Sequence, residues 1–482
     1  MNVRTLATAL LALIPFSSFA ADGEATKGKP NIVFILIDDM GWKDIAANGS
    51  TYYKTPNVDR LASEGMRFRN GYAACAVCSP SRAAIMTGQS PARLHLTDWI
   101  PGEGAPKTSR FTVPKWDMKV EKTTPTVAEL LKKQGYATAA IGKWHLGDDG
   151  PESHGFDVNV AGGHTGHPAS YFWPYGKEGN GHRVPGLAEA GGKEGEYLTD
   201  RLTDEAVKFI DTNKDKPFFL YLAHYAVHAP LMAKDDDTAV FKGAKADGQQ
   251  DFPVYAGMVK AVDDSVGRVL GELKKLGLDE NTIVIFTSDN GGVVHFHATD
   301  NAPLRGGKGF PYEGGLRVPF IVKAPGLTKP GSVNDTPVIG TDFLPTLAHF
   351  AGVNGKPAPV TDGVDITPAL RGEKLQRDTF VWHYPHYWWG GKISPYSVIH
   401  SGEWKLVRWN EYGSEELYHL SVDPSEKTDL AKQNPDKLKE MSAKLDAILK
   451  EQGAQAPVPR KDAPTAPNPD TNPAKAANFI RG

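Results

Sequence analysis

The residue types and spacing at positions 78–82 could carry out chemistry on an anion. The stretch 78–88 reads CSPSRAAIMTG, so a cysteine leads into a short Pro/Ser/Arg turn and then into a helical pattern. Pro80 suits the first turn of a helix, which places Cys78 at or just before a helix N-terminus, where partial positive charge favours anions. Arg82 lies one turn further along and can donate two hydrogen bonds to an oxyanion. The stretch therefore predicts a reactive side chain in an anion-binding cradle.

Polar side chains follow four apolar runs that are typical of buried strands. The clusters are Asp38 with Asp39, Lys143 with His145, His228 alone, and Asp289 with Asn290. The runs alternate with helical patterns, which indicates an α/β domain with a mostly parallel central sheet flanked by helices. Because ligands bind beyond the carboxyl ends of the strands in such sheets, we expect the four clusters to meet at one edge. This convergence predicts an active site without reference to any family.

The expected elements divide the chain into several regions. In the first part, strands are expected at 30–39, 137–141, 217–225, 282–288 and 318–323, and helices at 57–65, 126–134, 197–212 and 254–276. Beyond residue 372, short strands at 378–387, 396–400, 405–409 and 417–420 precede a helix at 434–451. We therefore predict a catalytic domain at 21–375, a small α+β subdomain with an antiparallel sheet at 376–453, and an extended Pro/Ala-rich tail at 454–482.

The two acidic clusters supply candidate metal ligands. Asp38, Asp39, Asp289 and Asn290 carry hard oxygen atoms, which suit Ca²⁺ better than Mg²⁺. Either pair alone would by default be interpreted as a cap of the loop that follows its strand. The sequence has no Cys/His cluster at the spacing of a zinc site.

Lys143 and His145 form the third cluster, on either side of a tryptophan in GKWHLG at 142–147. In an extended stretch, side chains two residues apart project to the same side. We therefore expect both side chains to face one site. A lone Lys-x-His pair would by default be a solvated lysine and a core histidine.

The order C-x-P-S-R, followed by Thr87 and Gly88, is the signature of the type I sulfatases. The chain resembles that family, which belongs to the alkaline-phosphatase-like superfamily, from about residue 30 to the end of the small subdomain. It is most similar to bacterial carbohydrate sulfatases. The resemblance implies that a maturation enzyme converts Cys78 to C-formylglycine, whose hydrate is the nucleophile. It also implies that both acid pairs and the modified residue 78 hold Ca²⁺.

The same resemblance assigns roles to the basic residues. Lys143 matches the lysine that contacts nucleophile and sulfate, and His145 the histidine that hydrogen-bonds the formylglycine hydrate. His228 matches the histidine near the leaving-group oxygen. Lys308, in GGKG at 306–309, matches a sulfate-binding lysine. With Arg82, the two lysines are expected to offset charge on the sulfuryl oxygens.

The substrate is expected to be a sulfated carbohydrate. Trp99 offers an aromatic face on which a sugar can stack, and His164 and His167 are polar groups near predicted loops. The stretch 94–102, LHLTDWIPG, is similar to carbohydrate sulfatases that act on galacto-configured sugars. The sugar and its sulfated position stay open.

Three other functions are compatible with parts of the pattern. A phosphonate or phosphate monoester hydrolase on the same fold would share the anion cradle. A glycan-binding protein would keep Cys78 unconverted and have no activity. Cys75 and Cys78 form a C-x-x-C pair, but a thiol redox site normally lies in a small thioredoxin-like unit, and this chain is far larger.

The charge composition limits the possible partners of the protein, and its N-terminal residues indicate its location. Lys+Arg number 54 and Asp+Glu 57, which argues against a nucleic-acid surface or a polybasic membrane patch. Arg4, an apolar run at 6–16 and a small-x-small site at 18–20 predict a signal peptide at 1–20. We therefore expect an exported protein, periplasmic or secreted, without a membrane anchor.

Overall fold

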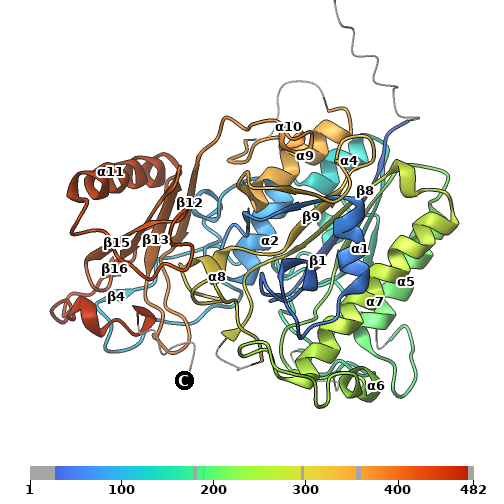
Figure 1. Cartoon of the computed structure of the whole chain (residues 1–482), viewed down its shortest axis with the longest axis horizontal. Helices are drawn as coiled ribbons and strands as arrows, with labels where there is room; N and C mark the ends of the chain where they lie inside the picture. The colour runs from blue at the N-terminus through green and yellow to red at the C-terminus, as the bar shows by residue number, and fades with distance from the viewer. Residues whose placement is uncertain (1–27, 177–181, 188, 295–297, 354–359, 476–482) are drawn as a thin grey trace, which may run out of the picture.

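The computed structural model describes residues 28–176, 182–187, 189–294, 298–353 and 360–475 (Figure 1). The predicted signal peptide at 1–20 lies outside these residues. Within them, no helix combines the length and the apolar character that crossing a membrane requires.

An eight-stranded mixed sheet forms the body of the protein, in the order β10-β2-β9-β8-β1-β7-β5-β6. These strands are β1 (Asn31–Ile37), β2 (Met66–Phe68), β5 (Ala137–Gly142), β6 (Val158–Val160), β7 (Phe218–Ala223), β8 (Thr282–Ser288), β9 (Phe320–Lys323) and β10 (Ser332–Asn334). The five strands from β8 to β6 run parallel, and β9 runs antiparallel to β2 and β8. The central strand β1 is buried along its whole length, which explains its continuous apolar run.

Two layers of helices cover the sheet (Figure 1). Val33 and Ile35 of β1 pack with one layer, which consists of α1 (Pro56–Glu64), α5 (Leu198–Thr212) and α7 (Pro253–Lys275). Ile32 and Phe34 pack with the other, which consists of α2 (Cys78–Thr87), α4 (Val127–Lys133), α9 (Phe343–Phe350) and α10 (Thr367–Leu370). Thr126 caps α4 in a capping box with Glu129. The predicted α/β architecture is confirmed.

Short elements complete the connections around this body. The helices are α3 (Pro91–Leu94), α6 (Asp235–Ala239) and α8 (Glu313–Leu316), and β3 (Gly71–Tyr72) pairs with β11 (Val338–Ile339).

A separate four-stranded antiparallel sheet follows, as predicted. It consists of β12 (Thr379–Tyr384), β13 (Tyr396–Ser401), β14 (Trp404–Trp409) and β15 (Ser414–His419), paired in chain order. One face packs against the body and the other against α11 (Pro435–Glu451). In the tail, β16 (Val458–Pro459) pairs with β4 (Phe111–Thr112), and Ala474 is buried, so the described part of the tail packs on the protein. The domain boundaries given above stay a prediction.

Candidate active site

Cys78 is the first residue of α2, and Val77 before it is extended. Its thiol lies 3.7 Å from Asp38 Oδ1 and accepts a hydrogen bond from Lys308 Nζ at 3.3 Å. Burial raises the pKa of Cys78 to about 12, although Lys143 and Lys308 oppose the shift. As a cysteine, residue 78 therefore stays a neutral thiol at neutral pH, which is a poor nucleophile.

The two acid pairs meet beside this residue. Asp38 and Asp39 follow β1, Asp289 and Asn290 follow β8, and these strands are parallel neighbours. Asn290 Nδ2 donates to Asp39 Oδ1 at 2.7 Å, and the Asp39 amide donates to Asp289 Oδ1 at 3.2 Å. The strand-end residues thus come together at one edge of the sheet, as the pattern predicted.

The oxygen atoms at this edge fit a hard cation. The amide nitrogen of Asn290 is held by Asp39 and by the Gly291 carbonyl, whereas Oδ1 of Asn290 is buried and has no hydrogen-bond partner among the described residues. Ligand atoms of Asp38, Asp39, Cys78 and His228 all lie within 4.8 Å of one another. An unpartnered buried oxygen next to clustered carboxylates is what a divalent cation would satisfy.

Three basic side chains pair with the three aspartates at this edge of the sheet. Arg82 Nη2 lies 2.7 Å from Asp289 Oδ2. Lys143 Nζ lies 2.7 Å from Asp38 Oδ2, and Lys308 Nζ lies 2.8 Å from Asp39 Oδ1. All six side chains are buried, so each charge depends on its partner.

Asp38 and Asp39 lie in different electrostatic environments, which shift their pKa values in opposite directions. Burial opposes ionisation of both, but the Lys308 charge holds the pKa of Asp39 well below its ordinary value. Burial and the carboxylate of Asp289 raise the pKa of Asp38 to about 7 despite Lys143. A cation at this site would reverse that shift, because it favours the ionised form.

The stretch that carries Lys143 and His145 is not extended, so the alternation of side chains along a strand does not apply to it. Gly142 has φ 103° and His145 has φ 58°, which bends the chain sharply after β5. At Gly142 a Cβ would lie 1.9 Å from the carbonyl oxygen of Ala223 on β7, so only glycine fits. His145 Nε2 lies 2.6 Å from the carbonyl oxygen of Ile100. Burial, aided by Lys143, keeps the pKa of His145 well below its usual range.

His228 lies at the open side of the cluster. Its side chain is 19% exposed, and its Nε2 atom is 3.5 Å from Asp39 Oδ2. Its Nδ1 atom lies 2.8 Å from the carbonyl oxygen of Ala229. Burial and the nearby Lys308 charge lower its pKa, so the ring is neutral in the free protein.

A loop at 163–167 contacts both histidines, and the sequence pattern did not reveal this. The His145 amide donates to the Gly163 carbonyl at 2.9 Å, and a Cβ at Gly166 would lie 2.7 Å from the His145 ring. The His167 ring stacks on His228, with centroids 5.6 Å apart. The glycine-rich run GGHTGH after β6 was the signal that could have indicated this close approach.

The remaining candidate residues differ in position. His164 is 61% exposed, and its ring lies 4.0 Å from Asp148. Trp99 is partly buried on the apolar cluster that joins the body to the second sheet, and the next amide, of Ile100, donates to Ser79 Oγ in α2. Their sugar contacts stay predictions. Cys75 is buried in the same apolar cluster, and burial raises its pKa to about 12, which suits a packing role better than a redox one.

Comparisons with known proteins agree over most of the chain. A family model described as "Sulfatase" matches residues 30–353, and one described as "N-sulphoglucosamine sulphohydrolase, C-terminal" matches residues 307–455. A sulfatase of Formosa agariphila is 34% identical, over 94% of this chain and 96% of its own. The N-acetylgalactosamine-6-sulfatase of Mus musculus is 34% identical, over 82% and 75% of the two chains.

A solved structure agrees with these relatives. The crystal structure of Ps i-CgsB in complex with k-i-k-neocarrahexaose matches with a TM-score of 0.73 and 34% identity, over 89% of this chain and 95% of that one. The geometry at Cys78 and the extent of these matches lead to one conclusion: the chain belongs to the sulfatase family, and it is an enzyme that hydrolyses sulfate esters.

Proposed function

We propose that this enzyme removes sulfate from a galacto-configured sugar of a sulfated polysaccharide, and that its nucleophile derives from Cys78. Two relatives support the substrate class. One is named an N-acetylgalactosamine-6-sulfatase, and the other was crystallised with k-i-k-neocarrahexaose. The stretch LHLTDWIPG at 94–102, which packs against α2 through Ile100 and Ser79, supports the same class.

We further propose that a maturation enzyme converts Cys78 to formylglycine and that Asp38, Asp39, Asp289 and Asn290 hold Ca²⁺. The bound cation and the aldehyde hydrate would together supply an activated hydroxyl for attack on sulfur. The signature C-x-P-S-R at 78–82 and the match of the sulfatase family model to residues 30–353 support this conversion.

The basic side chains would bind the sulfate group. Lys143 and Lys308 already lie at the nucleophile position, on Asp38 and Asp39, and Arg82 is fixed by Asp289. Because these charges are buried and held before the substrate arrives, they can stabilise negative charge on the sulfuryl oxygens without reorganising.

The two histidines suit opposite proton transfers. His145 is neutral and buried, so it can accept a proton from a hydroxyl of the hydrate. His228 reaches the open side and can donate a proton to the departing alcohol. It is neutral in the free protein, but the anionic sulfate ester would raise its pKa when it binds beside the ring.

The substrate-binding residues are proposed from their positions. His167 stacks on His228 and would therefore border the leaving sugar. Trp99 and the exposed His164 would contact the sugar further from the sulfur atom. These three residues select the sugar in this proposal, whereas the buried basic residues bind the sulfate.

The observation that carries the proposal is the position of Cys78, between Lys308 Nζ at 3.3 Å and Asp38 Oδ1 at 3.7 Å. The test is turnover of matched sulfate and phosphate esters, with the mass of the peptide containing residue 78 measured in the same sample. We expect sulfate-ester turnover in proportion to the converted fraction. Faster phosphate turnover would indicate a phosphate or phosphonate hydrolase. A thiol mass in every molecule from the native host, without turnover, would indicate a glycan-binding protein.

The substrate class needs a second measurement. Defined galacto- and gluco-configured sugars, each sulfated at a single position, should be compared by their kcat/KM. We expect the galacto-configured esters to react faster, and equal rates on both series would refute that part of the proposal.

A further inference from the structure

The segment 305–317, which carries Lys308, has little structure of its own. It reads RGGKGFPYEGGLR, with five glycines, and contains only the single-turn helix α8. Glycine-rich backbone loses the most conformational freedom when it is ordered. On the active-site side, the Lys308 amide donates to the Gly292 carbonyl at 3.1 Å, and the Gly309 amide donates to Ala76 at 2.8 Å. On the same side Asn301 Nδ2 donates to the Gly306 carbonyl at 2.9 Å and the Gly291 amide donates to the Gly315 carbonyl at 3.1 Å. A residue that must be placed to within about 0.5 Å also needs support on the other side of its segment.

The second sheet anchors the same segment from the other side. Lys405 on β14 is fully buried, and its Nζ atom lies 2.9 Å from Glu313 and 2.8 Å from Glu426. The Glu313 amide also donates to Glu426 Oε2 at 2.7 Å. Arg317 closes the group with a 2.6 Å contact to Glu313. We call these four residues, Glu313, Arg317, Lys405 and Glu426, the junction cluster.

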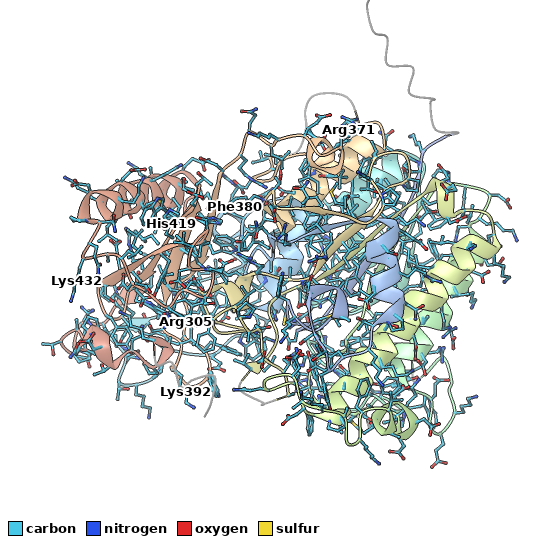
Figure 2. The ribbon with its side chains drawn as sticks, in the orientation of Figure 1. Arg305, Arg371, Phe380, Lys392, His419 and Lys432 are labelled. Carbon is cyan, nitrogen blue, oxygen red and sulfur yellow. The ribbon has the colours of Figure 1, made fainter. Side chains whose placement is uncertain are left out.

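Arg305 holds the other end of the segment. Its guanidinium donates to Tyr418 Oη at 3.1 Å, to the Glu426 carbonyl at 3.0 Å and to the Lys475 carbonyl at 3.0 Å. Figure 2 shows Arg305 at the border between the body and the second sheet. The C-terminal residues thus hold the segment on both sides of Lys308.

We propose that Lys405 and Glu426 are positioning residues for the reaction, because they hold the segment that places Lys308 against residue 78 and Asp39. This inference rests on the sulfate-binding role proposed for Lys308. Neither residue touches the sulfate. Their effect passes through the Glu313 side chain and amide to the backbone that carries Lys308. The small second sheet in this way supports the sulfate site through the junction cluster.

The test compares Lys405→Met with Arg408→Met. Both residues lie on β14, but Lys405 faces the body, whereas Arg408 faces α11 and pairs with Glu415 and Asp446. We expect Lys405→Met to raise the inhibition constant of inorganic sulfate about tenfold, a loss comparable to one charge-assisted hydrogen bond. We also expect faster hydrogen exchange at the amides of Lys308 and Gly309. Arg408→Met should change neither quantity in the folded enzyme.

A double-variant cycle separates positioning from general destabilisation. In a Lys308→Ala background, Lys405→Met should add little to the inhibition constant, because the group that it positions is already gone. Lys405→Arg should restore most of the affinity for sulfate. Where Lys405→Met does not fold, Glu426→Gln removes one partner with little change of shape and should give a smaller shift in the same direction.

Independent effects of Lys405→Met and Lys308→Ala on sulfate binding would overturn the inference. An equal effect of Arg408→Met would also overturn it. Failure of the proposed function would give a different result. The wild-type enzyme would then bind no inorganic sulfate at its active site, so no wild-type inhibition constant could be measured.

Discussion

Two buried groups of interleaved charges among the described residues differ in one respect that separates catalysis from structure. The strand-end cluster pairs three carboxylates with three basic side chains: Asp38, Asp39 and Asp289 with Arg82, Lys143 and Lys308. The junction cluster pairs two glutamates with a lysine and an arginine. Both are balanced in charge, which is what burial of ions requires.

The difference lies in what each cluster leaves available. Among the described residues, the Asn290 oxygen beside the strand-end cluster has no hydrogen-bond partner, and the cluster opens at His228, so it has a free ligand atom for a cation and an entrance for a sulfate. A divalent cation would give it two positive charges in excess, of which the monoanionic sulfate ester offsets one. In the junction cluster Glu313, Lys405 and Glu426 are fully buried and paired with one another, and Tyr72 also donates to Glu313 at 2.9 Å. A charge-balanced buried cluster therefore indicates a functional site only where it also has a ligand atom without a hydrogen-bond partner and is accessible from solvent.

The largest expected effect is the loss of the nucleophile. Cys78→Ala should lower kcat/KM for a sulfate ester by at least about 10⁴-fold, as removal of a nucleophile does in other hydrolases. The free energy of unfolding should change by less than about 1 kcal/mol, because the side chain is small and the charge pairs persist. Kinetics and urea unfolding check the two parts. Residual turnover near the wild-type rate would contradict the assignment of Cys78.

Cation removal should distinguish the two clusters directly. Chelation should lower activity by at least about a hundredfold, since a bound cation contributes several kcal/mol to transition-state stabilisation. Added Ca²⁺ should restore activity and raise the melting temperature. Asn290→Ala should require roughly tenfold more Ca²⁺ for the same activity.

The matched control for that experiment is Glu426→Gln in the junction cluster. It should lower the melting temperature and keep the wild-type response of the melting temperature to Ca²⁺. Loss of that response in the control would show that the two clusters cannot be separated in this way.

Most of the fold was predictable because its signals are local. Residues 31–37 form an apolar run that only a doubly covered strand buries, and Thr126 with Glu129 forms a capping box that starts α4. The order of the strands was not predictable, because β1 lies between β7 and β8, which come far later in the chain. Pairing over such separations depends on how the helices pack, and residue types alone do not specify it.

The residue types of the site were predictable from the sequence, but the backbone bends and distant side chains that position them were not. Asp38, Asp289 and Cys78 lie in short motifs whose chemistry can be read directly. The bend at Gly142 depends on how close β7 comes, which is a property of the packed sheet. Lys405 and Glu313 are 92 residues apart, and neither lies in a sequence motif that would predict their contact.

Lowering the pH should lower the free energy of unfolding through two buried histidines in and next to the second sheet. Burial lowers the pKa of His386 to about 3 and that of His400 to about 4, against an unfolded value of about 6.5. Below about pH 6.5 these histidines are therefore protonated in the unfolded chain but not in the native protein, so the free energy of unfolding falls as the pH falls. Each histidine should cost up to about 1.4 kcal/mol per pH unit between pH 6.5 and its native pKa.

Urea unfolding at pH 7.0 and 5.5 checks this dependence. His386→Gln should reduce the difference between the two pH values by about 1 kcal/mol, since one proton-binding group is gone. An unchanged difference would mean that His386 is protonated in the native state. Ca²⁺ should be kept saturating, so that the strand-end cluster does not contribute to the measured change.

The smallest effects are expected at the rim of the site, where two histidines of one loop can be compared. His167 stacks on His228, whereas His164 is largely exposed beside Asp148. His167→Ala should lower kcat/KM for a sulfated sugar about tenfold, because it removes a sugar contact and the support of the His228 ring. His164→Ala should lower it only about threefold, since an exposed polar contact competes with water. On an aryl sulfate, which lacks the sugar, His164→Ala should have no effect and His167→Ala should keep a part of its own. Equal losses on both substrates for the two variants would show that the loop acts on the fold and not on the leaving group.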